Sequence, residues 1–184
     1  MGLLVLGLAV FFSVHLMSSF RDARDTLIAR YGEKPYKAGY ALLSAIGLAL
    51  IVWGKIQADP VPLWQPPAWS RSLALWLMPL AFILLVGAYV PSNLRRLTAH
   101  PMLWAVTLWA VLHLLANGDL GSVLLFGAFA LYSLYAMWSQ TQRGAKPGDT
   151  VRPVSRDIAV VALGLAVYGA ALYGHRWLSG VTLV

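Results

Sequence analysis

The stretch "HPMLWAVTLWAVLHLLANGD", residues 100–119, contains the features that decide the fold. It opens on a His-Pro pair, continues as an apolar and tryptophan-rich run, and closes on Asn117, Gly118 and Asp119. Pro101 suits the first position of a helix, where its missing N–H costs nothing. The short step to the next apolar run predicts a tight helical hairpin in which Gly118 is free to take a positive φ.

The rest of the chain has the composition of a membrane protein. Of its 184 residues, 59% are hydrophobic and 11% are charged, and the mean hydropathy is +0.69. Windows of 17 to 20 residues without Lys, Arg, Asp or Glu recur along it, and each can cross a hydrocarbon core of about 30 Å. The sequence therefore predicts an all-α, polytopic integral membrane bundle, with residues 1–184 forming a single transmembrane domain in contact with the lipid bilayer.

Hydropathy predicts six transmembrane helices, and charge predicts their orientation. Eleven of the 14 Lys and Arg residues fall in the connections 21–39, 91–100 and 140–157. Because basic connections stay in the cytoplasm, both termini of this multi-pass protein are expected outside, which in a bacterium is the periplasm. The predicted spans are 2–20, 40–57, 72–90, 101–117, 120–139 and 158–178.

Composition also excludes several functions. The net charge of +7 is spread over connections and forms no long basic face, so no nucleic acid partner is expected. The absence of cysteine excludes disulfides, iron–sulfur clusters and covalently attached c-type haem. Along the last span, Ala162, Ala166, Ala170 and Gly174 recur every four residues, which predicts a packing face unless alanine is simply common there.

Histidines are the candidates for chemistry inside the membrane, where ionisable groups are costly. His113 is the sharpest case, because Trp109, His113 and Asn117 are spaced by four and share one helix face. That face could hold a planar apolar cofactor. The alternative is that the tryptophan only packs against neighbouring helices or anchors the helix at the membrane interface. Asn117 and Asp119 are expected to serve first as helix-end residues.

The other three histidines carry weaker predictions. His15 has Ser18, Ser19 and Asp22 within helical reach as partners that orient its ring; the alternative is a simple hydrogen bond to a neighbouring helix. His100, with Arg95 and Arg96 nearby, predicts either an anion site on the cytoplasmic side or a capping residue. His175 is expected to be an interfacial residue without a special role.

Two histidines facing each other across a bundle, with arginines for carboxylates, are compatible with b-type haem. The same pattern is compatible with a quinone site or a proton relay. At about 1.5 Å per residue from the cytoplasmic ends, His15 lies at roughly 9 Å, His113 near 20 Å and His175 near 26 Å. His113 and His175 therefore match more closely in depth, and depth alone does not favour the pair of His15 and His113.

The chain as a whole resembles a known family. The opening stretch, the following "LFGAFALYSLYAM", and "FFSVHLMSSFRD", "YKAGYALLSAIGLAL" and "SNLRRLTAHPM" are similar to the core of the NnrU family of bacterial membrane proteins. The resemblance implies an accessory role in denitrification, in nitrite and nitric oxide reduction, with denitrification components as partners.

The NnrU family is in turn similar to 15-cis-ζ-carotene isomerase, a membrane enzyme that uses haem b. By that similarity, His15 and His113 fall on the positions expected to ligate the haem iron, and His100 matches the histidine of the His-Pro motif. If haem is bound, Arg21, Arg24, Arg95 and Arg96 would be near enough to the same leaflet to meet its propionates. If a reaction occurs, an apolar substrate would be held beside Trp109. Whether this chain is an enzyme stays open; if it is, the resemblance implies a haem-dependent, redox or isomerase-like activity.

Two readings from other classes stand beside this one. The segment "LRRLTAHPM" resembles part of the isoprenylcysteine methyltransferases, which implies a cytoplasmic site for S-adenosylmethionine. However, the only glutamate is Glu33, so the C-terminal glutamate of that group is absent. The third reading is a non-catalytic membrane assembly factor that acts through helix contacts and needs no haem.

Overall fold

The computed structural model describes residues 1–181 and 183, and the regular elements in this part of the chain are all α-helices. The chain divides into two compact units, an N-terminal unit of Met1–Val61 and a C-terminal unit of Pro62–Val184. The helices are α1 (Gly2–Met17), α2 (Arg21–Tyr31), α3 (Glu33–Ile56), α4 (Ser70–Tyr89), α5 (Leu94–Leu97), α6 (Pro101–Ala116), α7 (Leu120–Gln142) and α8 (Val154–Ser179).

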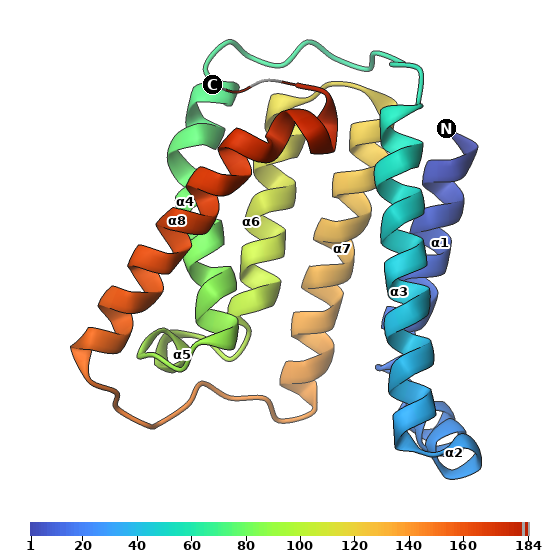
Figure 1. Ribbon diagram of the computed structural model, residues 1–184, viewed down its shortest axis with the longest axis vertical. Coiled ribbons are helices and arrows are strands. Elements are labelled where there is room, and N and C mark those ends of the chain that lie inside the picture. The colour runs from blue at the N-terminus through green and yellow to red at the C-terminus, as the bar shows by residue number, and fades with distance from the viewer. Residues whose placement is uncertain (182, 184) are drawn as a thin grey trace. The chain divides into compact units, whose positions relative to one another are not determined.

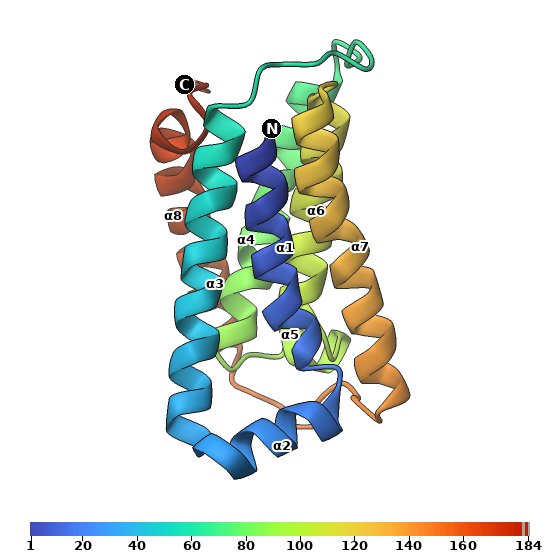
Figure 2. The same cartoon turned by 90° about the vertical axis from the view of Figure 1, so that its right-hand side faces the viewer.

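The N-terminal unit is built on the close packing of α1 against α3 (Figure 1). Glycines make this approach possible, because a Cβ on Gly7 would lie 2.6 Å from the Ile51 backbone nitrogen and one on Gly54 would overlap the backbone of Leu4. Leu4 and Ile51 are consequently 0% and 2% exposed. The polar helix α2 bends by 88° from α1 and leads to the start of α3 (Figure 2).

The C-terminal unit places α4 in the centre, between α6 and α8, while α7 packs on the other side of α6. Met78, Ala81 and Leu112 form its core, and Trp109 and Tyr168 pack against them. The long helices of this unit lie side by side in the order α8, α4, α6 and α7 (Figure 1). This unit contains His100, His113 and His175, so their geometry can be compared directly.

The face by which α8 packs differs from the face predicted by its small residues. Val160 and Gly164 are buried while Ala162 and Ala166 are exposed, and a Cβ on Gly164 would lie 2.8 Å from the Cα of Ile83 on α4. The Tyr168 hydroxyl donates to the Leu75 carbonyl oxygen at 2.7 Å. The prediction of an alanine packing face is therefore wrong for this bundle, because α4 meets the helix about half a turn away.

The helices agree with a multi-pass membrane protein but do not establish six spans. In the described part of the chain, α3, α4, α7 and α8 are long and apolar enough to cross a membrane, and the bent pair of α1 and α2 makes a fifth if it is one span. Helix α6 has 16 residues, about 24 Å at 1.5 Å per residue, which is shorter than the hydrocarbon core of about 30 Å. Six spans and outside termini stay predictions.

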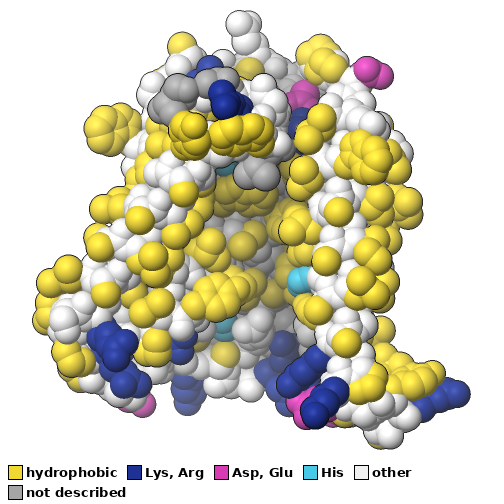
Figure 3. All heavy atoms as spheres, viewed as in Figure 1, with side chains coloured by type: hydrophobic (Ala, Val, Ile, Leu, Met, Phe, Trp, Pro, Cys, Tyr) yellow, Lys and Arg dark blue, Asp and Glu magenta, His cyan; other side chains and the backbone are white. Residues whose placement is uncertain are grey.

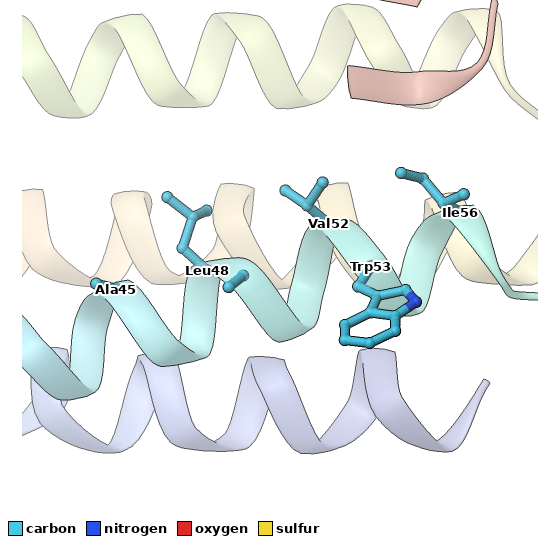
Figure 4. A pocket seen from close by; sticks show the side chains of 6 residues that line it. Ala45, Leu48, Val52, Trp53 and Ile56 are labelled. Carbon is cyan, nitrogen blue, oxygen red and sulfur yellow. The ribbon is translucent and has the colours of Figure 1, made fainter. Parts of the chain in front are cut away.

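The exposed surfaces of the long helices suit lipid. Only 11% of the apolar window of α8 and 17% of that of α3 are buried. Figure 3 shows hydrophobic side chains along α8, with Lys and Arg gathered at its N-terminal end. A shallow apolar hollow on α3 is lined by residues of that one helix (Figure 4): Ala45, Leu48, Ala49, Val52, Trp53 and Ile56. A hollow on a single helix surface indicates lipid contact and offers no polar group for recognition.

The hairpin between α6 and α7 is tight, as predicted, but for a different reason. Positive φ occurs at Gly32, Gly144 and Gly180 in the described residues, and Gly118 is not among them. Instead the Gly118 carbonyl oxygen accepts from the backbone nitrogens of Leu63 and Trp64, at 2.7 and 3.1 Å. A Cβ on Gly118 would overlap the Trp64 carbonyl oxygen, so glycine is required here for space.

Candidate functional site

The imidazole of His113 lies in the last turn of α6, half-buried in the C-terminal unit. Its Nδ1 lies 2.8 Å from the carbonyl oxygen of Trp109, one turn earlier. Because a carbonyl oxygen can only accept, Nδ1 carries the hydrogen and Nε2 carries the lone pair. Histidines that bind metals are held in this way, with one ring nitrogen donating to a backbone oxygen and the other free to coordinate.

Aromatic rings surround His113. The Phe126 ring of α7 stacks on it with centroids 4.5 Å apart, and the Trp109 ring lies 5.2 Å away. Trp109 in turn meets Phe126 and Phe129 edge to face, at 5.0 and 5.6 Å. These rings give the imidazole an apolar environment with a fixed orientation.

An apolar cavity of about 190 Å³ adjoins the Trp109 side chain, between α4 and α6. Hydrocarbon groups dominate its wall, so its chemistry favours an apolar occupant. The residues that line it are Ala81, Phe82, Leu85, Ala105, Val106 and Trp109.

His175 is the residue that the structure brings to His113. The two ring centroids lie 6.3 Å apart with their planes at 18°. The Nδ1 of His175 lies 2.8 Å from the Ser179 hydroxyl oxygen and 3.0 Å from the Val181 carbonyl oxygen. The expectation of an interfacial residue without a role missed this pairing, and the similar depth of the two histidines was the signal that pointed to it.

His15 belongs to the N-terminal unit, so its proposed pairing with His113 stays a prediction. Its Nδ1 lies 2.7 Å from the Phe11 carbonyl oxygen, and its ring stacks on Phe11 with centroids 3.9 Å apart. The Ser18 hydroxyl, predicted to orient the ring, donates to the His15 backbone carbonyl oxygen. His15 and His113 thus share the same local device, a bond from the ring to the carbonyl oxygen one turn earlier.

The contacts of His100 stabilise the packing of two helices. It is the N-cap residue of α6, 9% exposed, and its Nε2 lies 3.0 Å from the Thr141 hydroxyl oxygen of α7. Its backbone nitrogen donates to the Thr98 hydroxyl at 3.1 Å, and its buried Nδ1 has no hydrogen-bond partner among the described residues. The ring therefore joins the start of α6 to the end of α7.

The two arginines beside His100 are placed away from His113. The Arg95 guanidinium donates to the carbonyl oxygens of Gly87 and Ala88 at the end of α4, whereas Arg96 is exposed. His100 and His113 are separated by about 20 Å along α6, at 1.5 Å per residue. The positions of Arg95 and Arg96 thus give no support to the prediction that they bind propionates of a group at His113.

A polar clasp closes this same end of the C-terminal unit. The Asp157 carboxylate accepts from the backbone and side-chain nitrogens of Asn93, at 2.8 and 2.6 Å. The Asn93 side chain also exchanges two hydrogen bonds of 2.8 Å with the backbone of Arg152. The clasp joins the turn before α5 to the start of α8, so its polar groups serve the fold.

Asn117 and Asp119 end and begin helices, as predicted. The Asn117 side chain donates to the His113 carbonyl oxygen at 2.8 Å. The Asp119 carboxylate accepts from the Ser122 backbone nitrogen at 2.9 Å and from its hydroxyl at 2.6 Å. Asn117 therefore fixes the helix end that holds His113, and its amide bonds the backbone there.

Metal ligands are sparse in this protein. No group of three or more His, Asp or Glu side chains close enough to hold a metal ion occurs in the part of the chain that the structure describes. Two histidines of the C-terminal unit, His113 and His175, lie with their ring centroids 6.3 Å apart. A metal bound there would need its remaining ligands from another source.

Comparison with known proteins places the chain in one family. No curated protein matches it, and no solved structure does. A family model described as "NnrU protein" matches residues 3–183, which is nearly the whole chain. Together with the apolar helices, this match leads to one conclusion: the chain belongs to the NnrU protein family.

Proposed function

We propose that this NnrU-family chain binds haem b in the bacterial inner membrane and supports denitrification, in nitrite and nitric oxide reduction. The observation that carries the proposal is the state of His113. Its Nδ1 is held by the Trp109 carbonyl oxygen, its ring is flanked by Phe126 and Trp109, and its Nε2 has no hydrogen bond among the described residues. The link to denitrification rests on family membership.

The residues at this site suit haem. Imidazole is an established protein ligand of haem iron, and apolar aromatic walls suit a macrocycle. When bound, haem b would supply an iron centre that changes oxidation state. His113 is proposed as one axial ligand, and His15, whose ring is held by the Phe11 carbonyl oxygen, is the second ligand that the family resemblance implies.

A catalytic role, if present, would concern an apolar molecule. The cavity beside Trp109 lies one helical turn from His113 and is lined by apolar side chains. An apolar substrate held there would be shielded from water, which suits redox or isomerase-like chemistry on a double bond. The residues of this chain would bind and orient the substrate, because the cofactor would supply the redox chemistry.

The visible spectrum of the purified protein tests haem binding. After haem-replete expression, the wild-type protein is expected to show a Soret band, and His113→Ala is expected to lower the haem content per chain at least tenfold. Leu115→Ala is a matched control, because Leu115 is an exposed residue of the same helix. Absence of a Soret band in the wild type, or an equal band in His113→Ala, contradicts the proposal.

Complementation separates haem function from a non-catalytic assembly role. A denitrifying strain that lacks this chain is expected to regain nitrite and nitric oxide reduction with the wild-type protein and with Leu115→Ala, but not with His113→Ala. Full recovery with His113→Ala, at equal membrane abundance, would favour the assembly factor. The methyltransferase reading predicts S-adenosylmethionine binding that depends on His100, and calorimetry on the purified protein would detect it.

A further inference from the structure

A proline inside α4 frees a backbone carbonyl, and a side chain of another helix bonds it. Pro79 lies within this helix. Because proline has no backbone N–H, the carbonyl oxygen four residues earlier, that of Leu75, loses its helical hydrogen bond. The hydroxyl of Tyr168 on α8 donates to this oxygen at 2.7 Å. In the hydrocarbon region of a membrane a freed carbonyl needs such a partner from a neighbouring helix, because lipid offers none.

Helix α8 contacts α4 on both sides of this proline. Before Pro79, the Tyr168 hydroxyl bonds the Leu75 carbonyl oxygen. After Pro79, Gly164 lies so close to α4 that a Cβ there would be 2.8 Å from the Cα of Ile83. About one turn of α8 therefore joins the two halves of α4 across the position where a proline allows a helix to bend.

The half of α4 that follows Pro79 forms one wall of the apolar cavity of about 190 Å³. Three residues line the cavity from this half: Ala81, Phe82 and Leu85. The Phe82 ring also lies 5.8 Å from the Tyr168 ring, measured between centroids. Tyr168 thus contacts the α4 wall directly through Phe82 and fixes the preceding half of α4 through its hydroxyl.

The size and lining of the cavity indicate what it can hold. A cavity of about 150 Å³ with aliphatic and aromatic walls binds benzene, so a cavity of about 190 Å³ has room for one apolar ring or a hydrocarbon segment of that size. Its two aromatic lining residues, Phe82 and Trp109, are half-buried, so a molecule dissolved in the bilayer can reach them. A longer molecule can insert such a part when the α4 wall moves.

We propose that Tyr168 is a positioning residue for this cavity. Its bond to the Leu75 carbonyl oxygen holds the α4 wall against α6. Release of that bond lets α4 bend at Pro79, and an apolar ring or hydrocarbon segment then enters from the bilayer. The proposal rests on the proposed function, since that function holds an apolar substrate beside Trp109, but it needs neither haem nor a histidine.

A double-mutant cycle tests the link between Tyr168 and Pro79. Tyr168→Phe leaves the Leu75 carbonyl oxygen without its partner and should lower the midpoint of thermal unfolding in detergent by about 5 °C. In Pro79→Ala the restored N–H at position 79 can bond that oxygen, so adding Tyr168→Phe should lower the midpoint by about 1 °C. Tyr173→Phe is the matched control, because Tyr173 is an exposed tyrosine of α8. Equal shifts in the two backgrounds overturn the link.

Bromobenzene measures access to the cavity, because it is an apolar ring that quenches tryptophan fluorescence. The protein is compared in lipid nanodiscs with and without Trp109→Phe, and the difference gives the quenching that belongs to Trp109. This quenching should rise about twofold in Tyr168→Phe, since a wall without its bond spends more time open. It should stay at the wild-type level in Tyr173→Phe.

The outcomes separate this proposal from the proposed function. Trp109 quenching that does not rise in Tyr168→Phe, or that rises equally in Tyr173→Phe, overturns the positioning role and leaves the haem tests unchanged. This comparison decides the role even if Pro79→Ala does not fold. Absence of a Soret band in the wild type overturns haem binding and alters neither the unfolding cycle nor the quenching. Circular dichroism and gel filtration of each variant confirm that it is folded.

Discussion

The two ends of α6 each carry a histidine, and the two residues are placed in opposite ways. At one end, the Nε2 of His100 bonds the Thr141 hydroxyl of α7, and the neighbouring Arg95, Asn93 and Asp157 are joined to backbone or to each other. At the other end, His113 is held through Nδ1 alone and lies among aromatic rings.

The difference teaches how to separate a structural histidine from a candidate ligand. Burial alone does not decide, because His100 is the more buried of the two. What differs is the partner of the one ring nitrogen that is bonded. The Nε2 of His100 bonds the Thr141 hydroxyl of another helix, and its buried Nδ1 has no partner among the described residues, so this ring stabilises the contact of α6 with α7. The Nδ1 of His113 bonds only the carbonyl oxygen one turn earlier on its own helix, which orients the ring and leaves Nε2 for a ligand. Four experiments test this contrast, from the largest expected effect to the smallest.

The largest effect is expected when the histidine at each end of α6 is replaced in turn and the haem contents of the two variants are compared. His113→Ala should lower haem content at least tenfold, because it removes the proposed haem ligand, while His100→Ala should leave haem content within twofold of the wild type. Soret absorbance per mole of purified protein measures both. An equal loss of haem in the two variants would contradict the different roles assigned to His113 and His100.

The polar clasp beside His100 should contribute to stability and leave haem unaffected. Asp157→Ala removes the acceptor of two bonds from Asn93 and should lower the free energy of unfolding by about 3 kcal/mol, since bonds to a charged group are strong. Thermal unfolding in detergent, followed by circular dichroism, measures the loss. Arg156→Ala is the matched control, because Arg156 is exposed at the same helix end. A stable Asp157→Ala protein would show that the clasp is dispensable.

The hairpin at the His113 end should be sensitive to one added methyl group. In Gly118→Ala the new Cβ meets the Trp64 carbonyl oxygen, so the loop of Leu63 and Trp64 must shift, at a cost of about 2 kcal/mol. Unfolding in detergent should reveal this destabilisation. Gly127→Ala is the control, since no atom lies within 4 Å of a Cβ there, and equal behaviour of the two variants would argue against a steric role for Gly118.

The smallest effect concerns the hydrogen bond of His100. His100→Ala removes the bond to Thr141 and a buried ring, and should destabilise the protein by about 1 kcal/mol. His100→Gln should recover part of that loss, because an amide can also reach the hydroxyl. The midpoint of thermal unfolding measures both variants; a midpoint unchanged in His100→Ala would mean that the bond contributes nothing.

Local sequence signals predicted the apolar helices, but the connection predicted at 21–39 is wrong, because it contains α2 and the first residues of α3, and the short helix α5 was also not predicted. Long apolar runs predicted the regions of α3, α4, α7 and α8, and Asn117 and Asp119 were correctly expected at helix ends. These features depend on the nearest residues along the chain. Gly118 was placed correctly in the turn, but the reason was wrong, because its requirement comes from Trp64, 54 residues away.

Features that depend on neighbouring helices were harder to predict. The small-residue pattern at Ala162, Ala166 and Ala170 suggested a packing face, yet α8 turns Val160 and Gly164 towards α4. Alanine is small enough for either a contact or a lipid surface, so its spacing alone cannot choose. His175 was assigned no role for a similar reason, since nothing adjacent to it in the sequence refers to His113.

The sequence by itself determined that this is a helical membrane protein of the NnrU family, because hydropathy, charge bias and family motifs are properties of the linear chain. It also singled out His113, through its place one turn after Trp109 on a single helix. Only the tertiary structure decided that the ring of His100 bonds α7 while His113 meets His175. Those contacts join helices distant in the sequence, and their direction depends on how each helix is rotated against its neighbour.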